Sequence, residues 1–162
     1  MQSEFIARVL VLLAVANGVP VIAKRLLGNA FAYPLDGGSA FIDGRPIFGP
    51  AKTIRGILLS VLATSAFAPA IGLSATAGGL IAVAAMAGDL ASSFVKRRMG
   101  YASSSRATGL DQLPECLLPA LVGKGLLGLT FTDVIMIVVL FTLGEMLLSR
   151  LLFKLHVRDQ PY

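Results

Sequence analysis

The sequence predicts an all-α integral membrane protein, a bundle of about five transmembrane helices. Of its 162 residues, 56% are hydrophobic and only 14% are charged, whereas soluble domains usually carry about 25% charged residues. A soluble domain of this length could not bury so much apolar surface. Long apolar runs also alternate with shorter polar segments along the chain. The length predicts a single domain that covers residues 1–162.

Five apolar runs are the candidate spans: residues 5–23, 56–71, 77–95, 112–127 and 134–153. A helix needs about 20 apolar residues to cross a bilayer. The first, third and fifth runs meet that length, and the second and fourth can still pack inside a bundle where protein covers them. In the first run, Asn17, Gly18 and Pro20 predict either a kinked, polar-lined helix or a proline at the membrane interface.

The basic residues predict the orientation of the chain. Segment 24–55 has five Lys or Arg residues, segment 96–111 has four and the tail from residue 150 has three, which is 12 of the 14 in the chain. Five spans place these three segments on one side, and the short turns 72–76 and 129–133 on the other. Because Lys and Arg favour cytoplasmic loops, the N-terminus is predicted outside and the C-terminus in the cytoplasm. The predicted location is the cell (inner) membrane, as a multi-pass protein.

Composition also excludes several functions. A net charge of +5 would suit nucleic-acid binding, but the charges lie between apolar runs and not on one soluble face, so no nucleic acid is expected. Cys116 is the single cysteine, which excludes an intrachain disulfide. His156 is the single histidine, which excludes a metal site built from several histidines of one chain.

Asp89 is the most informative residue, because a carboxylate inside an apolar helix is costly unless it faces a cation or a polar cavity. Ser92, Ser93 and Lys96 follow at helical spacing and share its face. This stripe suits a divalent cation bound to phosphate oxygens, and Asp111 supplies a second carboxylate at the start of the next apolar run. The alternative is a structural ion pair between Asp89 and Lys96.

The polar segment between the first two runs is too long and too specific for a simple linker. Its glycines allow backbone N–H groups to approach an anion, although ordinary turns explain them equally well: Gly37, Gly38, Gly44 and Gly49. Lys52, Thr53 and Arg55 at the start of the next helix favour anion binding, because a helix N-terminus attracts phosphate. No Walker A motif is present.

Several segments, in order along nearly the whole chain, resemble the CDP-archaeol synthase family, small membrane cytidylyltransferases related to phosphatidate cytidylyltransferase. The matching segments are residues 16–21 (ANGVPV), 34–38 (PLDGG), 43–56 (DGRPIFGPAKTIRG), 88–98 (GDLASSFVKRR), 110–112 (LDQ) and the tail 154–162. The resemblance implies that a lipid phosphate attacks the α-phosphorus of CTP, which releases pyrophosphate and forms a CDP-activated lipid.

The resemblance also implies the site residues and the cofactor, Mg²⁺. Asp89 and Asp111 would hold the metal and, with Lys96, form the catalytic group. The residues expected to bind CTP and the lipid phosphate are Asn17, Asp36, Gly37, Asp43, Gly44, Arg45, Gly49, Lys52, Thr53, Arg55, Ser93, Arg97, Arg98 and Gln112. The expected partners are CTP, a membrane lipid phosphate and the bilayer, and a homo-oligomer is compatible with the sequence.

Two other functions remain compatible with the residues alone. One is a small transporter or channel with an ion site at Asp89, and the other is a non-catalytic membrane subunit. A transporter predicts polar residues spread through several helices, whereas this chain concentrates them at one side. A subunit would not require two carboxylates beside a basic segment. The residue pattern therefore favours the enzyme over the transporter and over the non-catalytic subunit.

Overall fold

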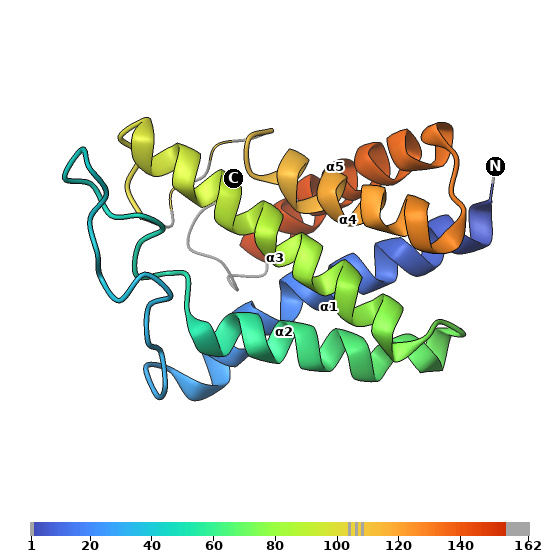
Figure 1. Ribbon diagram of the computed structural model, residues 1–162, viewed down its shortest axis with the longest axis horizontal. Helices are drawn as coiled ribbons and strands as arrows, with labels where there is room; N and C mark the ends of the chain where they lie inside the picture. The colour runs from blue at the N-terminus through green and yellow to red at the C-terminus, as the bar shows by residue number, and fades with distance from the viewer. Residues whose placement is uncertain (1, 104, 106, 108, 155–162) are drawn as a thin grey trace.

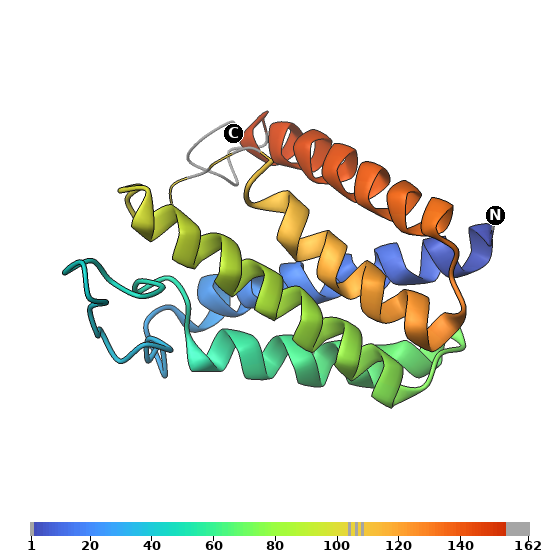
Figure 2. The same cartoon turned by 45° about the horizontal axis from the view of Figure 1, so that its top comes forward.

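The computed structural model describes residues 2–103, 105, 107 and 109–154, with side chains as far as residue 147. Within that part of the chain, five α-helices form an elongated bundle in which each helix runs antiparallel to the one before it (Figures 1 and 2). They are α1 (Ser3–Leu27), α2 (Ile54–Phe67), α3 (Ala75–Arg98), α4 (Gln112–Leu127) and α5 (Phe131–Lys154), with a 3₁₀ turn η1 (Ala68–Ile71) after α2. The all-α prediction is confirmed, and each predicted run lies within a helical segment.

Side-chain caps define where the helices begin. The hydroxyls of Thr53 and Ser74 each accept a hydrogen bond from the backbone N–H three residues on, at 3.1 Å, at the starts of α2 and α3. At the start of α5, Thr130 and Asp133 exchange such bonds, because each side chain accepts from the backbone N–H of the other (3.2 and 3.0 Å). These polar caps let the helices extend beyond the apolar runs.

Helix α1 continues through its polar centre. It is one 25-residue helix with Pro20 inside it, so the change in character at Asn17 and Gly18 does not end the helix. Ser60 of α2 donates a hydrogen bond to the Ala16 carbonyl, at 2.7 Å. This bond ties the two helices together beside the proline, where the backbone has lost a donor.

Small residues let α3 pack closely in the centre of the bundle, against α1, α2 and α4. A Cβ added to Gly78 would lie 2.5 Å from the Cβ of Ala68, and one added to Gly88 would lie 2.1 Å from the Pro114 carbonyl oxygen. Small residues at helix contacts are typical of membrane bundles, where close packing replaces the hydrophobic effect as the source of association.

Large apolar side chains face outward along the helices, as expected in lipid. Leu62 of α2 is 64% exposed and Ile135 of α5 is 62% exposed. In the described residues, three helical segments are long and apolar enough to cross a membrane: Ser3–Leu27, Ile54–Ile71 and Ala75–Arg98. An extended apolar surface of this kind has no place in water, so the protein is a membrane protein.

The polar loops lie together at one end of the bundle. The loop between α1 and α2 and the one between α3 and α4 are both there, whereas the N-terminus and the turns before α3 and α5 are at the opposite end (Figures 1 and 2). The basic tail at 155–162 lies outside the described residues. This grouping of the loops is the arrangement that five spans require.

The grouping predicts the result of a topology experiment. Reporter fusions after Arg55 and after Arg98 should both give a cytoplasmic signal, and a fusion at Ser74 should give the opposite signal, because an odd number of spans separates Ser74 from each of them. Paired fusions to alkaline phosphatase and a fluorescent protein would measure this. A non-cytoplasmic signal at Arg98 would contradict the five-span topology.

Candidate active site

Asp36 organises the loop between α1 and α2. Its carboxylate accepts hydrogen bonds from the backbone N–H groups of Gly38 (3.0 Å), Phe48 and Gly49 (2.9 Å each). Burial raises the pKa of this carboxyl, but hydrogen bonds from backbone N–H groups together lower it more, and the net pKa lies below its ordinary value. The structure therefore gives Asp36 the role of shaping the loop from within.

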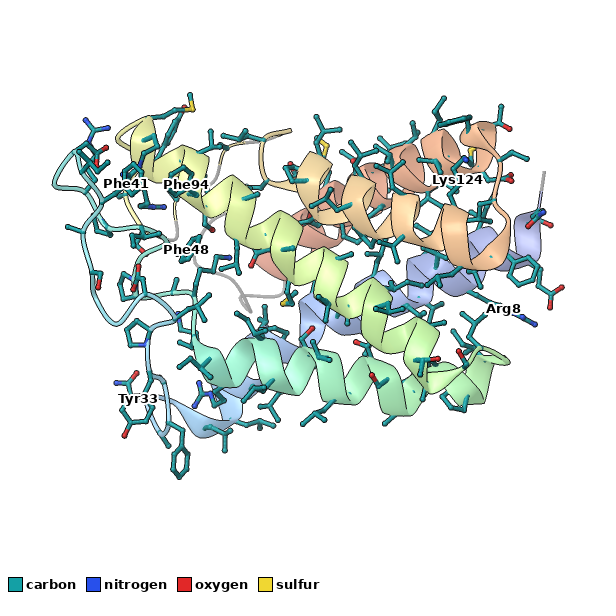
Figure 3. All side chains as sticks on the ribbon, viewed as in Figure 1. Arg8, Tyr33, Phe41, Phe48, Phe94 and Lys124 are labelled. Atoms are coloured by element: carbon teal, nitrogen blue, oxygen red, sulfur yellow. The ribbon has the colours of Figure 1, made fainter. Side chains whose placement is uncertain are left out.

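Arg98, at the end of α3, fastens this loop to the bundle. Its guanidinium pairs with Asp43 at 2.6 Å, donates to the Arg45 carbonyl at 3.2 Å and lies over the rings of Phe41 (4.8 Å) and Phe94 (5.0 Å). The two rings meet edge to face, with centroids 5.3 Å apart (Figure 3). Asp43 and Arg98 thus form a clasp between the loop and α3.

A basic pocket of about 340 Å³ lies between this loop and the segment after α3. Its lining residues are Arg45, Pro46, Gly49, Arg97, Gly100, Tyr101, Ala102 and Ser103. Arg97 is only 5% exposed, and Arg45 donates to the Arg97 carbonyl at 3.3 Å. Two guanidinium groups in a pocket of this size suit a phosphorylated small molecule.

Asp89 pairs with Lys52, so the pairing with Lys96 considered from the sequence is wrong. The Lys52 ammonium contacts both carboxylate oxygens of Asp89, across 37 residues of sequence. Both side chains are about three-quarters buried. Ser92 uses its hydroxyl inside α3, where it donates to the Asp89 carbonyl at 2.9 Å. The loop lysine and the intramembrane carboxylate therefore form one ionic site.

Lys96 pairs with Asp111 instead, at 2.6 Å, and also donates to the Ser105 carbonyl at 2.8 Å. The other Asp111 oxygen accepts from the Ala107 N–H at 2.9 Å. Lys96 is seven residues beyond Asp89 on α3, which corresponds to about 10 Å along a helix. The two predicted metal ligands, Asp89 and Asp111, are thus each neutralised by a different lysine.

Glu115 is a site residue that the sequence interpretation missed. Because Gly88 has no Cβ, the backbone of α4 at Pro114 packs directly on α3, and this contact brings the Glu115 carboxyl within hydrogen-bonding reach of Asp89. Glu115 lies in an apolar run, as Asp89 does. The rule that an acidic residue in such a run needs a polar partner could have identified it.

The remaining predicted residues have other places in the fold. Thr53 caps α2, and Arg55 donates to the carbonyls of Ala30 and Gly28 at the start of the loop. Gln112 accepts from the Gly109 N–H at 2.6 Å. Ser93 is buried, with 2% of its surface exposed. Gly37 and Gly44 have positive φ. The buried Nδ2 of Asn17 has no hydrogen-bond partner within the described residues.

The residues around Asp89 fit a magnesium ion through their donor chemistry. Asp89 and Glu115 offer carboxyl oxygens side by side, next to the positive charge of Lys52. In the described part of the chain, no three His, Cys, Asp or Glu side chains are arranged to hold a metal. Mg²⁺ does not require such a cage, because one or two carboxylates usually hold it together with substrate phosphates.

The fold and this site define an integral membrane protein that combines buried carboxyl groups with a basic pocket at one end of its bundle. The family model described as CarS-like, CDP-archaeol synthase, matches residues 65–162. The chain belongs to the CDP-archaeol synthase family, and it is a membrane cytidylyltransferase of lipid biosynthesis.

Individual relatives agree with this assignment. The CDP-archaeol synthase of Hyperthermus butylicus is 37% identical over 86% of both chains, and that of Pyrobaculum calidifontis is 35% identical over 91% of both. A solved structure of an intramembrane enzyme for archaeal membrane lipid biosynthesis superimposes with a TM-score of 0.69, at 31% identity, over 86% of this chain and 91% of that one. The fold and the family thus agree along most of the chain.

The close contact of α3 with α4 predicts that one methyl group added at Gly88 lowers the stability of the protein. Gly88→Ala should destabilise the protein by about 1–3 kcal/mol, because its Cβ would overlap the Pro114 backbone and push Glu115 away from Asp89. The control is Gly125→Ala in α4, where the new Cβ has no atom within 4 Å apart from its chain neighbours and the adjacent backbone of its own helix. The control should be neutral or slightly stabilising. Thermal unfolding in detergent measures both, and equal stability of the two variants would contradict the close contact.

Proposed function

We propose that this protein transfers the cytidylyl group of CTP to a membrane lipid phosphate, with Mg²⁺ as the cofactor and the active site facing the cytoplasm. An oxygen of the lipid phosphate attacks the α-phosphorus of CTP, and the bond between that phosphorus and the oxygen bridging to the β-phosphorus breaks. The products are a CDP-activated lipid and pyrophosphate. A phosphate monoester is largely dianionic at neutral pH, so its oxygen is a nucleophile without a general base.

The observation that carries the proposal is the ionic contact between Lys52 and Asp89. It joins the loop that borders the basic pocket to a carboxylate inside the helical bundle. A water-soluble nucleotide and a lipid phosphate must meet at such a boundary. The names of the relatives support an archaeol-type lipid phosphate as the acceptor.

Positioning and charge neutralisation are the main tasks in phosphoryl transfer. In the proposal, Arg45 and Arg97 bind the phosphates of CTP in the pocket, and the clasp of Asp43 and Arg98 keeps the loop in place. Lys52 moves from Asp89 to a phosphate oxygen when CTP binds. Asp89 and Glu115 would hold Mg²⁺, which would supply positive charge to the phosphate oxygens of CTP.

Lys96 and Asp111 form the second ionic pair of the proposed site. Asp111 is a metal ligand in the proposal, as the sequence led us to expect, and it is freed when a phosphate takes its place on Lys96. The buried pair keeps both charges neutralised until then, because an unpaired charge in this environment is costly. In the proposal, Lys96 and Asp111 therefore stabilise the protein when no ligand is bound, and they bind the ligands when these are present.

The proposal predicts opposite effects of two substitutions on Mg²⁺ binding. Asp89→Asn should remove Mg²⁺-dependent thermal stabilisation and lower turnover by roughly 100-fold or more, because an amide keeps the shape of the ligand but loses its charge. Lys52→Met should strengthen Mg²⁺ binding in the absence of CTP, since it removes the cation that competes for Asp89. It should also weaken CTP binding by roughly 10-fold.

Thermal shift and calorimetric titration of purified protein measure these effects, and Lys24→Met, on the exposed end of α1, is the control. If Asp89 served only to neutralise Lys52, the double variant Asp89→Asn with Lys52→Met would be more stable than either single variant, and no substitution would change Mg²⁺ affinity. That result would remove Asp89 from the catalytic site.

A further inference from the structure

The turn that follows α1, residues 28–33, presents two aromatic side chains outward. Phe31 is 74% exposed and Tyr33 is 69% exposed. We propose that this aromatic turn is seated in the headgroup layer of the bilayer, where its rings contact the upper acyl chains and neighbouring basic residues contact anionic lipid phosphates. The proposal depends on the membrane character of the protein and not on its catalytic chemistry.

The backbone holds the Phe31 ring in this exposed position. Phe31 has a φ of +56°, and it is the only non-glycine residue with positive φ in the described part of the chain. A bulky residue rarely adopts this conformation without support. Arg55, from the start of α2, provides the support, because its guanidinium donates to the carbonyls of Ala30 and Gly28. The turn is therefore pinned with its aromatic side chain facing away from the bundle.

The aromatic turn continues the lipid-facing surface of α1. In the last part of that helix, Val21 is 56% exposed, Ile22 is 58% exposed and Leu26 is 78% exposed. Because α1 is long and apolar enough to span a membrane, this surface is covered by lipid up to the point where the turn begins. Tyrosine, such as Tyr33 in this turn, is enriched at that level of the bilayer because its ring is amphipathic.

Charge indicates which partner covers the turn. Lys24 and Arg25 are exposed in the last turn of α1, directly before the aromatic turn. Basic residues beside aromatic ones suit the phosphates of an anionic membrane surface. Tyr33 lies at the opposite corner of this end of the molecule from Phe41 and Phe94, whose rings pack with Arg98 by the pocket (Figure 3). The Tyr33 ring thus lies away from the rings that pack with Arg98.

The absence of tryptophan from the sequence allows a direct test. Phe31→Trp places a single tryptophan in the turn, which can be excited selectively over the tyrosines, and Tyr33→Trp serves as a second probe if the first variant does not fold. The matched control is Ile42→Trp, because Ile42 is 95% exposed in the same loop but lies beside Asp43, in the part of the loop that Arg98 fastens to α3. Each variant is reconstituted into vesicles that contain phosphatidylglycerol.

We expect Phe31→Trp to emit at shorter wavelength than the control, to be quenched by lipids brominated near the top of the acyl chain, and to be several-fold less accessible to acrylamide. Lys24→Gln with Arg25→Gln should reduce the bromolipid quenching. Emission and acrylamide quenching equal to those of Ile42→Trp would overturn the proposal. The proposal would also be overturned if protection of the tryptophan from acrylamide increased with protein concentration and brominated lipids did not quench its emission. A second copy of the protein would then cover the turn.

Discussion

The need to neutralise Asp89 inside an apolar helix is the constraint on which the rest of the structure depends. A carboxylate at that depth requires a cation or a polar cavity, and the cation comes from Lys52, at the far end of the loop between α1 and α2. The loop must therefore fold back over the end of the bundle. Asp36 shapes it from inside, and Arg98 fastens it to α3. One charge in a helix thus determines the arrangement of a long polar segment.

The same constraint explains why the site is ready to bind ligands. Two of the carboxyl groups that we assign to the metal are each held by a lysine until a ligand arrives, Asp89 by Lys52 and Asp111 by Lys96. Exchange of these partners replaces one set of ion pairs by another, so no charge is left stranded in a poorly hydrated environment. Binding of CTP and Mg²⁺ should therefore be coupled, because each ligand takes one member of a pair and frees the other.

Most of the fold could be predicted from hydropathy, because apolar runs of the required length have few alternatives to a helix in a membrane. The run 112–127 coincides with α4, whereas α3 extends to Arg98, beyond the predicted end at 95. The difference arises because Lys96, Arg97 and Arg98 continue the helix while their charged groups bind loop carbonyls and carboxylates. Polarity alone does not mark the end of a helix.

The ion pairs of the site could not be predicted in the same way. Helical spacing suggested Lys96 as the partner of Asp89, but a lysine 37 residues earlier takes that place, since tertiary contacts of a loop leave no periodic pattern in the sequence. Glu115 was missed because its position beside Asp89 depends on the close approach at Gly88. The residue types at the site could be read from the sequence, whereas their pairing required the structure.

The central claim is that this bundle joins a nucleotide to a membrane lipid. The most direct measurement is the product balance of the purified wild-type protein, reconstituted with CTP, Mg²⁺ and ether- or ester-linked lipid phosphates. We expect equal amounts of CDP-lipid and pyrophosphate with at least one of these lipids, and no CDP-lipid when Mg²⁺ is removed. CTP consumption that yields no CDP-lipid with any of them, from protein that binds CTP and Mg²⁺, would contradict it.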